Sequence, residues 1–143
     1  MNPVHYSSVK DYYETPPEIF DPLNERFNFT LDPCCQESTA KAKKFYTKED
    51  NGLKQDWGGE TVFVNPPYGR ALPKWVEKCY NEAQKENTTV VMLIPARPDT
   101  RYFHKFIYHN SKEFTFIKGR VKFLLNGERT KHAAPFPSMT VVF

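Results

Sequence analysis

The stretch Thr61-Val62-Phe63-Val64-Asn65-Pro66-Pro67-Tyr68-Gly69 says most about the fold of this chain. Its first four residues are β-branched or aromatic and two prolines follow, which indicates a buried strand that ends in a rigid loop. In open α/β sheets, ligands bind beyond the carboxyl ends of the strands. We therefore expect a binding site where this strand ends, in the loop that begins at Asn65.

The residues of this loop suit an exocyclic amine on a flat ring. The Asn65 side-chain oxygen and the Pro66 main-chain carbonyl can accept the two amine hydrogens, and Tyr68 can stack on the ring. The amine lone pair is then turned toward an incoming electrophile. This pattern is typical of an N-methyltransferase, with Asn65, Pro66, Pro67 and Tyr68 as its catalytic loop.

The tetrapeptide resembles the Asp/Asn-Pro-Pro-Tyr/Phe/Trp motif of amino-methyltransferases that use S-adenosylmethionine. The chain is similar, from about Tyr13 to its C-terminus, to the phage-type Dam DNA N6-adenine methyltransferases. The ordered series of landmarks carries more weight than the tetrapeptide alone. These landmarks are Thr15-Pro16-Pro17, Leu31-Asp32-Pro33-Cys34, Asp50-Asn51-Gly52-Leu53, Gln55-Asp56-Trp57, Asn65-Pro66-Pro67-Tyr68, Trp75-Val76, Leu93-Ile94-Pro95-Ala96 and Gly119-Arg120-Val121-Lys122-Phe123.

Hydrophobic periodicity outside the loop predicts alternating helices and strands. Helices are expected from Thr15, which would cap the first turn in a capping box with Glu18, and over 36–44, 72–85 and 102–108. Strands are expected over 27–31, 45–47, 61–64, 88–94, 113–117, 121–125 and 138–143. This order predicts an α/β fold with a compact, mostly parallel sheet finished by antiparallel C-terminal strands. The resemblance implies the same Rossmann-like methyltransferase sheet.

The resemblance implies S-adenosyl-L-methionine as cofactor and suggests residues that hold it. Asp32 matches the position that contacts the cofactor's methionine end, although a structural Asp that caps the next helix is the alternative. Asp56 matches the acid that accepts a hydrogen bond from the adenine amine, with Trp57 packed nearby.

Three further residues are candidates for the cofactor site. Asp50 suits the ribose hydroxyls, but turn residues are often simply Asp. Thr15 and Pro16 would cover the cofactor from the N-terminal side, and Thr15 could equally be a plain helix cap. No metal site is expected.

Pro33-Cys34-Cys35 departs from the glycine-rich turn that most methyltransferases carry at this strand tip. The Pro-Cys pair also invites comparison with cytosine-C5 methyltransferases, which use a Pro-Cys nucleophile to add covalently to the ring. Here the pair follows the strand where the cofactor belongs, and no other loop offers a competing cofactor site. We therefore disfavour the nucleophile interpretation.

Size and composition indicate a folded, moderately basic protein. The 143 residues are enough for one domain, 39% of them are hydrophobic, and the formal net charge is +3. We expect a flexible N-terminal arm over residues 1–12 and a single methyltransferase domain over 13–143. No apolar run approaches the roughly 20 residues needed to span a bilayer, and no signal peptide is evident, so we expect a cytoplasmic protein, in the host if it is phage-encoded.

The expected substrate is adenine in duplex DNA, which must be flipped out of the stack before its N6 amine can react. Arg70, Arg97, Arg120 and Lys122 are the candidates for contacts with DNA. A homodimer is possible, because the chain lacks a large separate recognition domain.

Two alternatives stay open at this point. The same loop could methylate RNA bases or a protein glutamine amide. The unusual Pro33-Cys34-Cys35 tip could instead mark a non-catalytic nucleic-acid-binding protein built on a degenerate methyltransferase fold.

Overall fold

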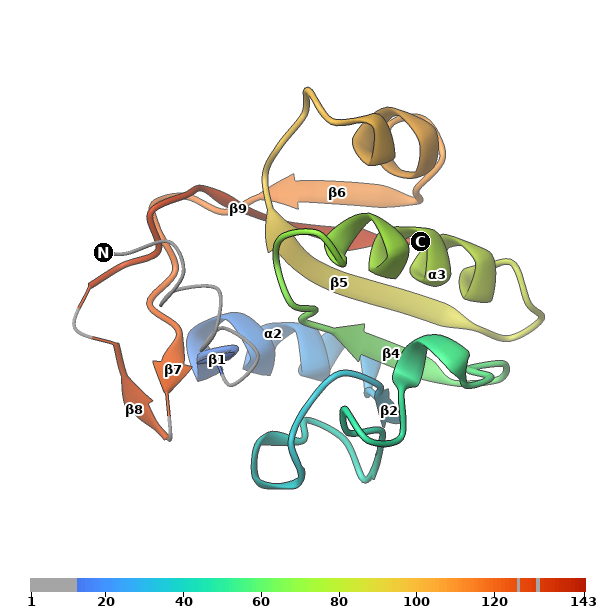
Figure 1. Cartoon of the computed structure of the whole chain (residues 1–143), viewed down its shortest axis with the longest axis horizontal. Coiled ribbons are helices and arrows are strands. Elements are labelled where there is room, and N and C mark those ends of the chain that lie inside the picture. The colour runs from blue at the N-terminus through green and yellow to red at the C-terminus, as the bar shows by residue number, and fades with distance from the viewer. Residues whose placement is uncertain (1–12, 126, 131) are drawn as a thin grey trace.

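The computed structural model describes residues 13–125, 127–130 and 132–143, so the expected arm over 1–12 lies outside the described residues. A six-stranded sheet in the order β3-β2-β4-β5-β9-β6 forms its centre (Figure 1). The pairs β2–β3, β2–β4 and β4–β5 are parallel, whereas β9 runs antiparallel to both β5 and β6. The predicted α/β fold, a mostly parallel sheet finished by antiparallel C-terminal strands, is thereby confirmed, with β9 as the strand that runs antiparallel to its neighbours. Its strands are β2 (Leu31–Asp32), β3 (Lys44–Phe45), β4 (Thr61–Val64), β5 (Thr89–Pro95), β6 (Glu113–Phe116) and β9 (Ser138–Val142).

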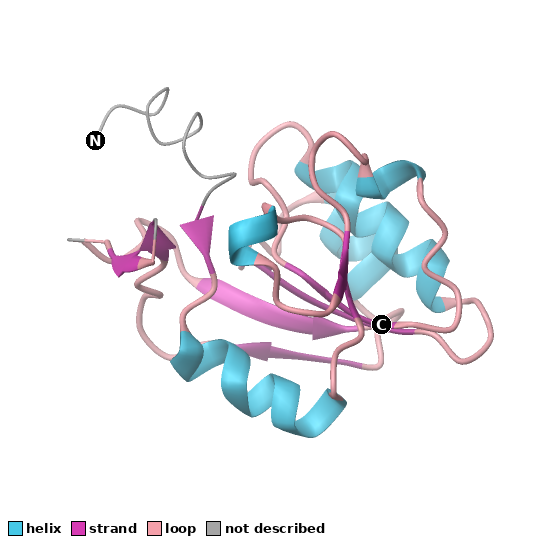
Figure 2. Cartoon of the chain, turned by 90° about the horizontal axis from the view of Figure 1, so that it is seen from below, coloured by secondary structure: helices cyan, strands magenta, loops and turns pink. Residues whose placement is uncertain are grey.

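Helices cover both faces of the sheet (Figure 2). Helix α3 (Leu72–Ala83) packs on one face against Val62, Val64 and their neighbours in β5, and helix α2 (Pro17–Phe27) packs on the other against Phe63. Because successive side chains of a strand point to opposite faces, β4 and β5 contribute alternate residues to two separate hydrophobic clusters. This burial on both faces explains why their sequences are continuously apolar.

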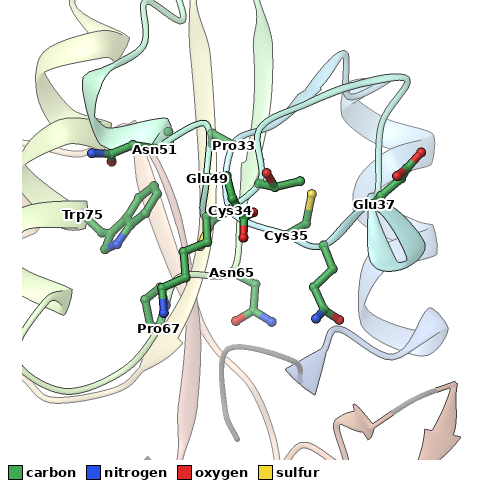
Figure 3. Close-up of a pocket in the computed structure, with 13 residues that line it drawn as sticks. Pro33, Cys34, Cys35, Glu37, Glu49, Asn51, Asn65, Pro67 and Trp75 are labelled. Atoms are coloured by element: carbon green, nitrogen blue, oxygen red, sulfur yellow. The ribbon is translucent and has the colours of Figure 1, made fainter. Parts of the chain in front are cut away.

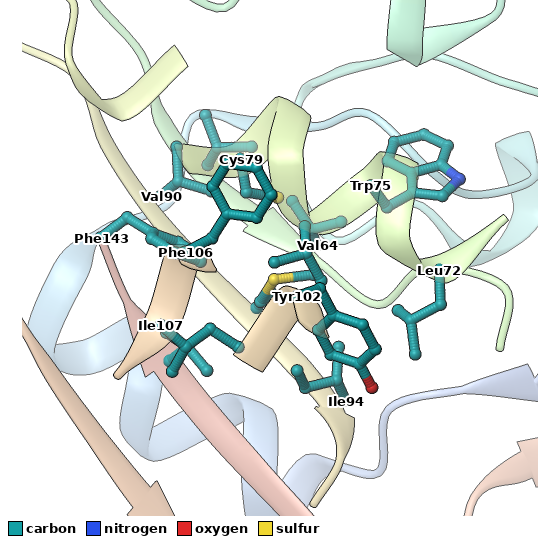
Figure 4. Packing of buried hydrophobic residues seen from close by; sticks show 14 of the residues in the cluster. Val64, Leu72, Trp75, Cys79, Val90, Ile94, Tyr102, Phe106, Ile107 and Phe143 are labelled. Carbon is teal, nitrogen blue, oxygen red and sulfur yellow. The ribbon is translucent and has the colours of Figure 1, made fainter. Parts of the chain in front are cut away.

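The cluster on the α3 face is the larger one (Figure 4). α3 contributes its inward face to this cluster, since Leu72, Trp75, Val76 and Cys79 are all buried. Alongside α3, a short π-helix, η4 (Phe103–Ile107), lies where a regular helix over 102–108 was predicted, and its Phe106 and Ile107 join the same cluster.

A second, three-stranded sheet lies beside the carboxyl ends of the central strands. It pairs β1 (Tyr13–Glu14), β7 (Leu124–Leu125) and β8 (Glu128–Arg129), all antiparallel. The sequence predicted a strand over 121–125 but not its partner: β7 pairs with the start of the described chain rather than with the central sheet. This pairing brings Tyr13 close to the loop that follows β4.

Some predicted element boundaries were wrong. The residue that precedes α2 is Pro16, and the Thr15 side chain does not cap the helix. Phe27, predicted to begin a strand, ends α2, because Asn28 takes the left-handed conformation (φ 55°) that terminates helices. The strand β2 is therefore only Leu31–Asp32.

Two short 3₁₀-helices complete the loops near the sheet edge. The helix predicted over 36–44 is reduced to η2 (Glu37–Thr39), whose capping box is formed by Gln36 and Thr39. The turn predicted around Asp50 leads into η3 (Gly52–Lys54). Within the described part of the chain, no helix has the length and apolar character needed to cross a membrane.

Candidate active site

The loop after β4 places the Asn65 side chain between two hydrogen-bonding partners. Its amide Nδ2 donates to the main-chain carbonyl of Tyr13 at 3.3 Å, and its Oδ1 accepts a hydrogen bond from the Tyr68 hydroxyl at 2.8 Å. The Tyr68 hydroxyl also lies 3.4 Å from the carbonyl of Leu93 in β5. The structure thus brings the predicted residues Asn65 and Tyr68 into direct contact.

The Tyr68 ring is half-buried and is held by two other aromatic rings. It lies edge-on to Phe136, with centroids 5.4 Å apart, and to Phe123 at 6.2 Å. Pro66 is buried and Pro67 half-buried, so the two prolines join the rigid end of β4 to a tyrosine whose orientation is fixed by packing.

A cavity of about 670 Å³ opens at the carboxyl ends of β2, β3 and β4 (Figure 3). Asn65 and Pro67 form one wall, the loop after β2 forms another, and Trp75 of α3 contributes an aromatic surface. The remaining wall comes from the segment between β3 and η3. Its lining residues are Pro33, Cys34, Cys35, Gln36, Glu37, Thr47, Lys48, Glu49, Asn51, Gly52, Asn65, Pro67 and Trp75.

Asp32 lies behind this cavity and holds the loop after β2. Its carboxylate oxygens accept hydrogen bonds from the main-chain N–H groups of Cys34 (3.2 Å) and Lys41 (3.0 Å). The side chain is buried, and burial raises the pKa of Asp32 to about 6 in spite of these hydrogen bonds. Both oxygens are thus engaged with the loop itself, and Asp32 is not among the residues that line the cavity.

The raised pKa of Asp32 predicts a pH-dependent stability. Because the folded-state pKa is higher than the unfolded value, the stability from this group is complete at low pH and is lost as the pH rises through about 6. A rise in the Asp32 pKa from 3.8 to about 6 corresponds to on the order of 3 kcal/mol over the full range. Urea unfolding at pH 7.5 and 5.0 should therefore show the wild type gaining stability relative to Asp32→Asn at the lower pH. Asp21→Asn, which makes the same change of charge at an exposed residue, is the control. The stability difference between the wild type and Asp21→Asn should be the same at both pH values, and an equal pH dependence for the two variants would contradict this explanation.

Trp57 supports the cavity from within the core and does not line it. It is fully buried, its main-chain N–H donates to Glu82 at 2.6 Å, and its ring stacks near Trp75 with centroids 6.3 Å apart. Its indole Nε1 donates to the Gly52 carbonyl at 3.0 Å. Trp57 therefore fixes two pieces of the cavity wall, Gly52 and Trp75.

Asp50 and Asp56, both predicted to contact the cofactor, lie outside the cavity lining. The Asp50 carboxylate turns back onto Thr47, accepting hydrogen bonds from its N–H (2.9 Å) and its hydroxyl (3.0 Å). The Asp56 side chain is 79% exposed and pairs with Lys85 at 2.8 Å. The residues on either side of Asp50, Glu49 and Asn51, face the cavity instead.

Thr15 lines a small polar chamber next to the main cavity, together with Asp32 and Asn65; Pro16, also buried, precedes α2. This chamber has a volume of about 20 Å³. The Thr15 hydroxyl is buried and has no hydrogen-bond partner among the described residues. The structure thus brings Thr15, Asp32 and Asn65 together, and leaves Asp50 and Asp56 apart from them.

The two adjacent cysteines line the main cavity, at the strand tip where the sequence placed the cofactor. The Cys35 thiol lies 3.6 Å from the Asp32 carbonyl, and burial raises the pKa of Cys35 well above its usual range. A thiol that resists deprotonation is a poor nucleophile. Burial therefore makes Cys35 a poor candidate for covalent chemistry.

The four cations predicted to contact DNA are all exposed, and none takes part in an ion pair with another described residue. Arg70 lies in the loop that follows β4 and Arg97 follows β5, so both come just after carboxyl ends of central strands. Arg120 and Lys122 lie between β6 and β7. By contrast, Lys41 and Lys44 are paired with Glu14 and Glu60.

The sequence is similar to those of known DNA methyltransferases. The family described as DNA N-6-adenine-methyltransferase (Dam) matches the chain over residues 4–143. The chain belongs to this Dam family. It is 37% identical over 141 residues to the DNA N-6-adenine-methyltransferase of Haemophilus phage HP1 (strain HP1c1), which covers 95% of this chain and 80% of the relative.

Two further relatives of this Dam-family chain match over shorter stretches. The DNA N-6-adenine-methyltransferase of Escherichia phage T1 is 36% identical over 113 residues, 78% of this chain and 46% of the phage protein. The putative methyltransferase YfdM of Escherichia coli (strain K12) is 38% identical over 74 residues, which are 46% of this chain and 81% of that protein.

Proposed function

We propose that this Dam-family protein transfers a methyl group from S-adenosylmethionine to the N6 amine of adenine in duplex DNA. The observation that carries the proposal is the position of Asn65. This residue directly follows β4, lines the cavity of about 670 Å³ and contacts Tyr68. One side chain therefore lies between a space that suits a cofactor and an aromatic ring that suits a base.

The cavity has the size and the chemical groups that S-adenosylmethionine requires. Its volume of about 670 Å³ falls within the roughly 300–1,000 Å³ of typical small-molecule sites. Trp75 offers an aromatic surface for adenine, Glu49 and Asn51 offer oxygen acceptors for ribose hydroxyls, and Glu37 offers a carboxylate for the ammonium group. Asp32 and Trp57 would act indirectly, by holding the loops that form the walls.

The cofactor supplies an electrophilic methyl group, so the protein mainly contributes position and electrostatics. The Asn65 oxygen and the Pro66 carbonyl would accept the two hydrogens of the adenine amine. An amide oxygen has two lone pairs, so Asn65 Oδ1 can keep its hydrogen bond from Tyr68 while it accepts one from the base. Asn65 is not a base, and the proton would leave late, to water or to a carbonyl.

The target adenine must leave the DNA stack to reach Asn65. Tyr68 would provide the stacking surface for the flipped base, with its ring held by Phe123 and Phe136. The exposed cations Arg97 and Arg120 would hold the DNA backbone on either side.

The DNA contacts predict a specific effect on salt dependence. Arg97→Gln and Arg120→Gln should each weaken binding to all duplex sequences by a similar factor. Each should also reduce the slope of log affinity against log salt concentration by about one, because one phosphate contact is lost. Fluorescence anisotropy with two unrelated duplexes at several salt concentrations would measure both quantities. Lys44→Gln, which removes a cation already paired with Glu60, serves as the control, and slopes equal to the wild type in the arginine variants would remove these residues from the interface.

The substrate is tested by the transfer of tritiated methyl groups from S-adenosylmethionine to three acceptors in parallel: unmethylated duplex DNA, RNA and folded protein. We expect label in the duplex DNA only. Label in RNA or in protein glutamine would instead support the alternative substrates of the same loop. Failure to bind S-adenosylmethionine in a calorimetric titration would favour a non-catalytic nucleic-acid-binding protein.

A further inference from the structure

The side chain of Asn65 has two ends of similar size and opposite hydrogen-bonding character. In the proposed function only the oxygen is useful at the reacting amine, because the amide nitrogen donates and cannot accept. If the amide were turned over, its N–H₂ group would face the amine hydrogens and the site would lose an acceptor. Some neighbouring group must therefore define which end faces the base.

The two partners of Asn65 differ in their ability to do this. A tyrosine hydroxyl can donate or accept, so Tyr68 could satisfy either end of the amide. A main-chain carbonyl only accepts, and the carbonyl of Tyr13 lies 3.3 Å from Nδ2. Of these two contacts, that with Tyr13 is the one that distinguishes the nitrogen from the oxygen.

The position of the Tyr13 carbonyl is itself fixed by distant parts of the chain. β1 pairs with β7, placing Tyr13 opposite Leu125, and the Tyr13 ring stacks on Phe123 with centroids 6.2 Å apart and planes 11° apart. The next residue, Glu14, forms a largely buried ion pair with Lys41 at 2.8 Å. Three separate contacts thus hold a strand of only two residues against the catalytic loop.

We propose that the main-chain carbonyl of Tyr13 orients the Asn65 amide, so that β1 is a positioning element of the active site and position 65 of this chain requires asparagine rather than aspartate. The inference rests on the proposed function of Asn65. It adds a requirement for one residue type, because the Asp/Asn-Pro-Pro-Tyr/Phe/Trp motif allows either aspartate or asparagine at its first position.

Asn65→Asp should be impaired in a way that depends on pH. An ionised carboxylate would place an oxygen against the Tyr13 carbonyl, with two acceptors in contact and no hydrogen between them. A protonated carboxyl would donate to Tyr13 through its O–H and keep its other oxygen for the amine, as asparagine does. Asp32 and Glu14 line the adjoining chamber and disfavour a further negative charge at position 65, whereas the positive charge of Lys41 favours it. The Tyr68 hydroxyl can donate a hydrogen bond to the carboxyl group in its ionised and in its protonated form.

The experiment is a double-mutant cycle of methyl transfer to duplex DNA with Asn65→Asp, Tyr13→Gly and the double variant at pH 8.0 and 5.5. Each rate is divided by the wild-type rate at the same pH, so that titration of Asp32, common to all four proteins, cancels to first order. We expect Asn65→Asp to lose at least about tenfold at pH 8.0 and to recover severalfold at pH 5.5. Tyr13→Gly removes the ring that stacks on Phe123 and frees the backbone, so it should slow the wild type more than it slows Asn65→Asp.

Tyr108→Gly is the matched control, because it removes a tyrosine that stacks on another ring, Phe103, between η4 and β6. Its effect should add to that of Asn65→Asp. Provided that the wild type methylates DNA, either of two results would overturn the inference. One is that the effects of Tyr13→Gly and Asn65→Asp are additive, and the other is that Asn65→Asp is as active as the wild type at pH 8.0. Absence of methyl transfer by the wild type would overturn the proposed function and this inference with it.

A second measurement does not depend on activity or on the folding of Asn65→Asp. The side-chain amide protons of Asn65 can be followed by ¹⁵N NMR in the wild type and in Tyr13→Gly. We expect at least one Asn65 Nδ2 proton to be shifted downfield and slow to exchange in the wild type, and to lose both properties in Tyr13→Gly but not in Tyr108→Gly. Equal spectra for this amide in all three proteins would show that Tyr13 does not hold it.

Discussion

Replacing Asn65 with alanine is expected to reduce the rate of methyl transfer to duplex DNA by at least about 100-fold, the loss typical of removing one preorganised hydrogen-bonding group from a reacting centre. The substitution removes both the acceptor for the amine hydrogen and the partner of the Tyr68 hydroxyl. It should leave the affinity for S-adenosylmethionine within a few-fold of the wild type, because most of the cavity wall comes from other residues.

Single-turnover rates at saturating cofactor and DNA would measure this loss apart from any change in binding. Asn81→Ala is a suitable control, because Asn81 is an exposed residue of α3 and alanine is compatible with a helix. A loss below about fivefold in Asn65→Ala would show that Asn65 is not the group that holds the amine.

Gly52→Ala is expected to weaken the binding of S-adenosylmethionine by at least about tenfold and to destabilise the fold by about 1–3 kcal/mol, the usual range for an overpacked site. A Cβ atom at position 52 would lie 2.0 Å from the carbonyl oxygen of Pro33, well inside van der Waals contact. Gly52 cannot easily move away, because it is buried and its own carbonyl accepts hydrogen bonds from Trp57 Nε1 (3.0 Å) and from the N–H of Gln55 (3.2 Å). The substitution would therefore push apart two walls of the cavity.

Calorimetric titration with S-adenosylmethionine and urea unfolding would measure the two effects of Gly52→Ala. Gly59→Ala provides the control, since Gly59 has a positive φ of 81° but no atom within 4 Å of a built Cβ. It should cost about 1 kcal/mol of stability through backbone strain and leave the cofactor affinity unchanged. Wild-type cofactor affinity in Gly52→Ala would show that the loops around Gly52 and Pro33 do not form the cofactor site.

The central strands and α3 were predictable because their patterns are local. β5 is a continuous apolar run that ends at Pro95, β4 is a shorter run soon followed by two prolines, and α3 repeats its buried residues at helical spacing. The boundary between α2 and β2 was not predictable from the sequence, because Phe27 and Phe29 alternate with polar residues as in a strand and both pack in the same hydrophobic cluster. Their rings lie 5.7 Å apart, although one ends a helix and the other lies in the loop before β2.

The candidate site was predictable only where a motif defined it. Asn65 and Tyr68 lie together as the motif predicted, but the direction of a side chain in a turn depends on contacts that sequence does not show. Asp50 is the clearest example: it folds back onto Thr47, so that its neighbours Glu49 and Asn51 line the cavity.

Long-range contacts were hidden from sequence reasoning as well. The hydrogen bond between Asn65 and Tyr13 joins residues 52 positions apart and depends on the pairing of β1 with β7. Trp75 is buried in the core, with 7% of its surface exposed, and it also forms part of the cavity wall.

The central claim is most directly tested by identifying the methylated nucleoside. Unmethylated duplex DNA would be incubated with the protein and labelled S-adenosylmethionine, digested to nucleosides and separated by chromatography with mass detection. We predict that the label is recovered as N6-methyl-2′-deoxyadenosine and is absent from the DNA treated with Asn65→Ala. Label in a methylated cytosine, or equal label with Asn65→Ala, would contradict the assignment of Asn65 as the group that presents the adenine amine.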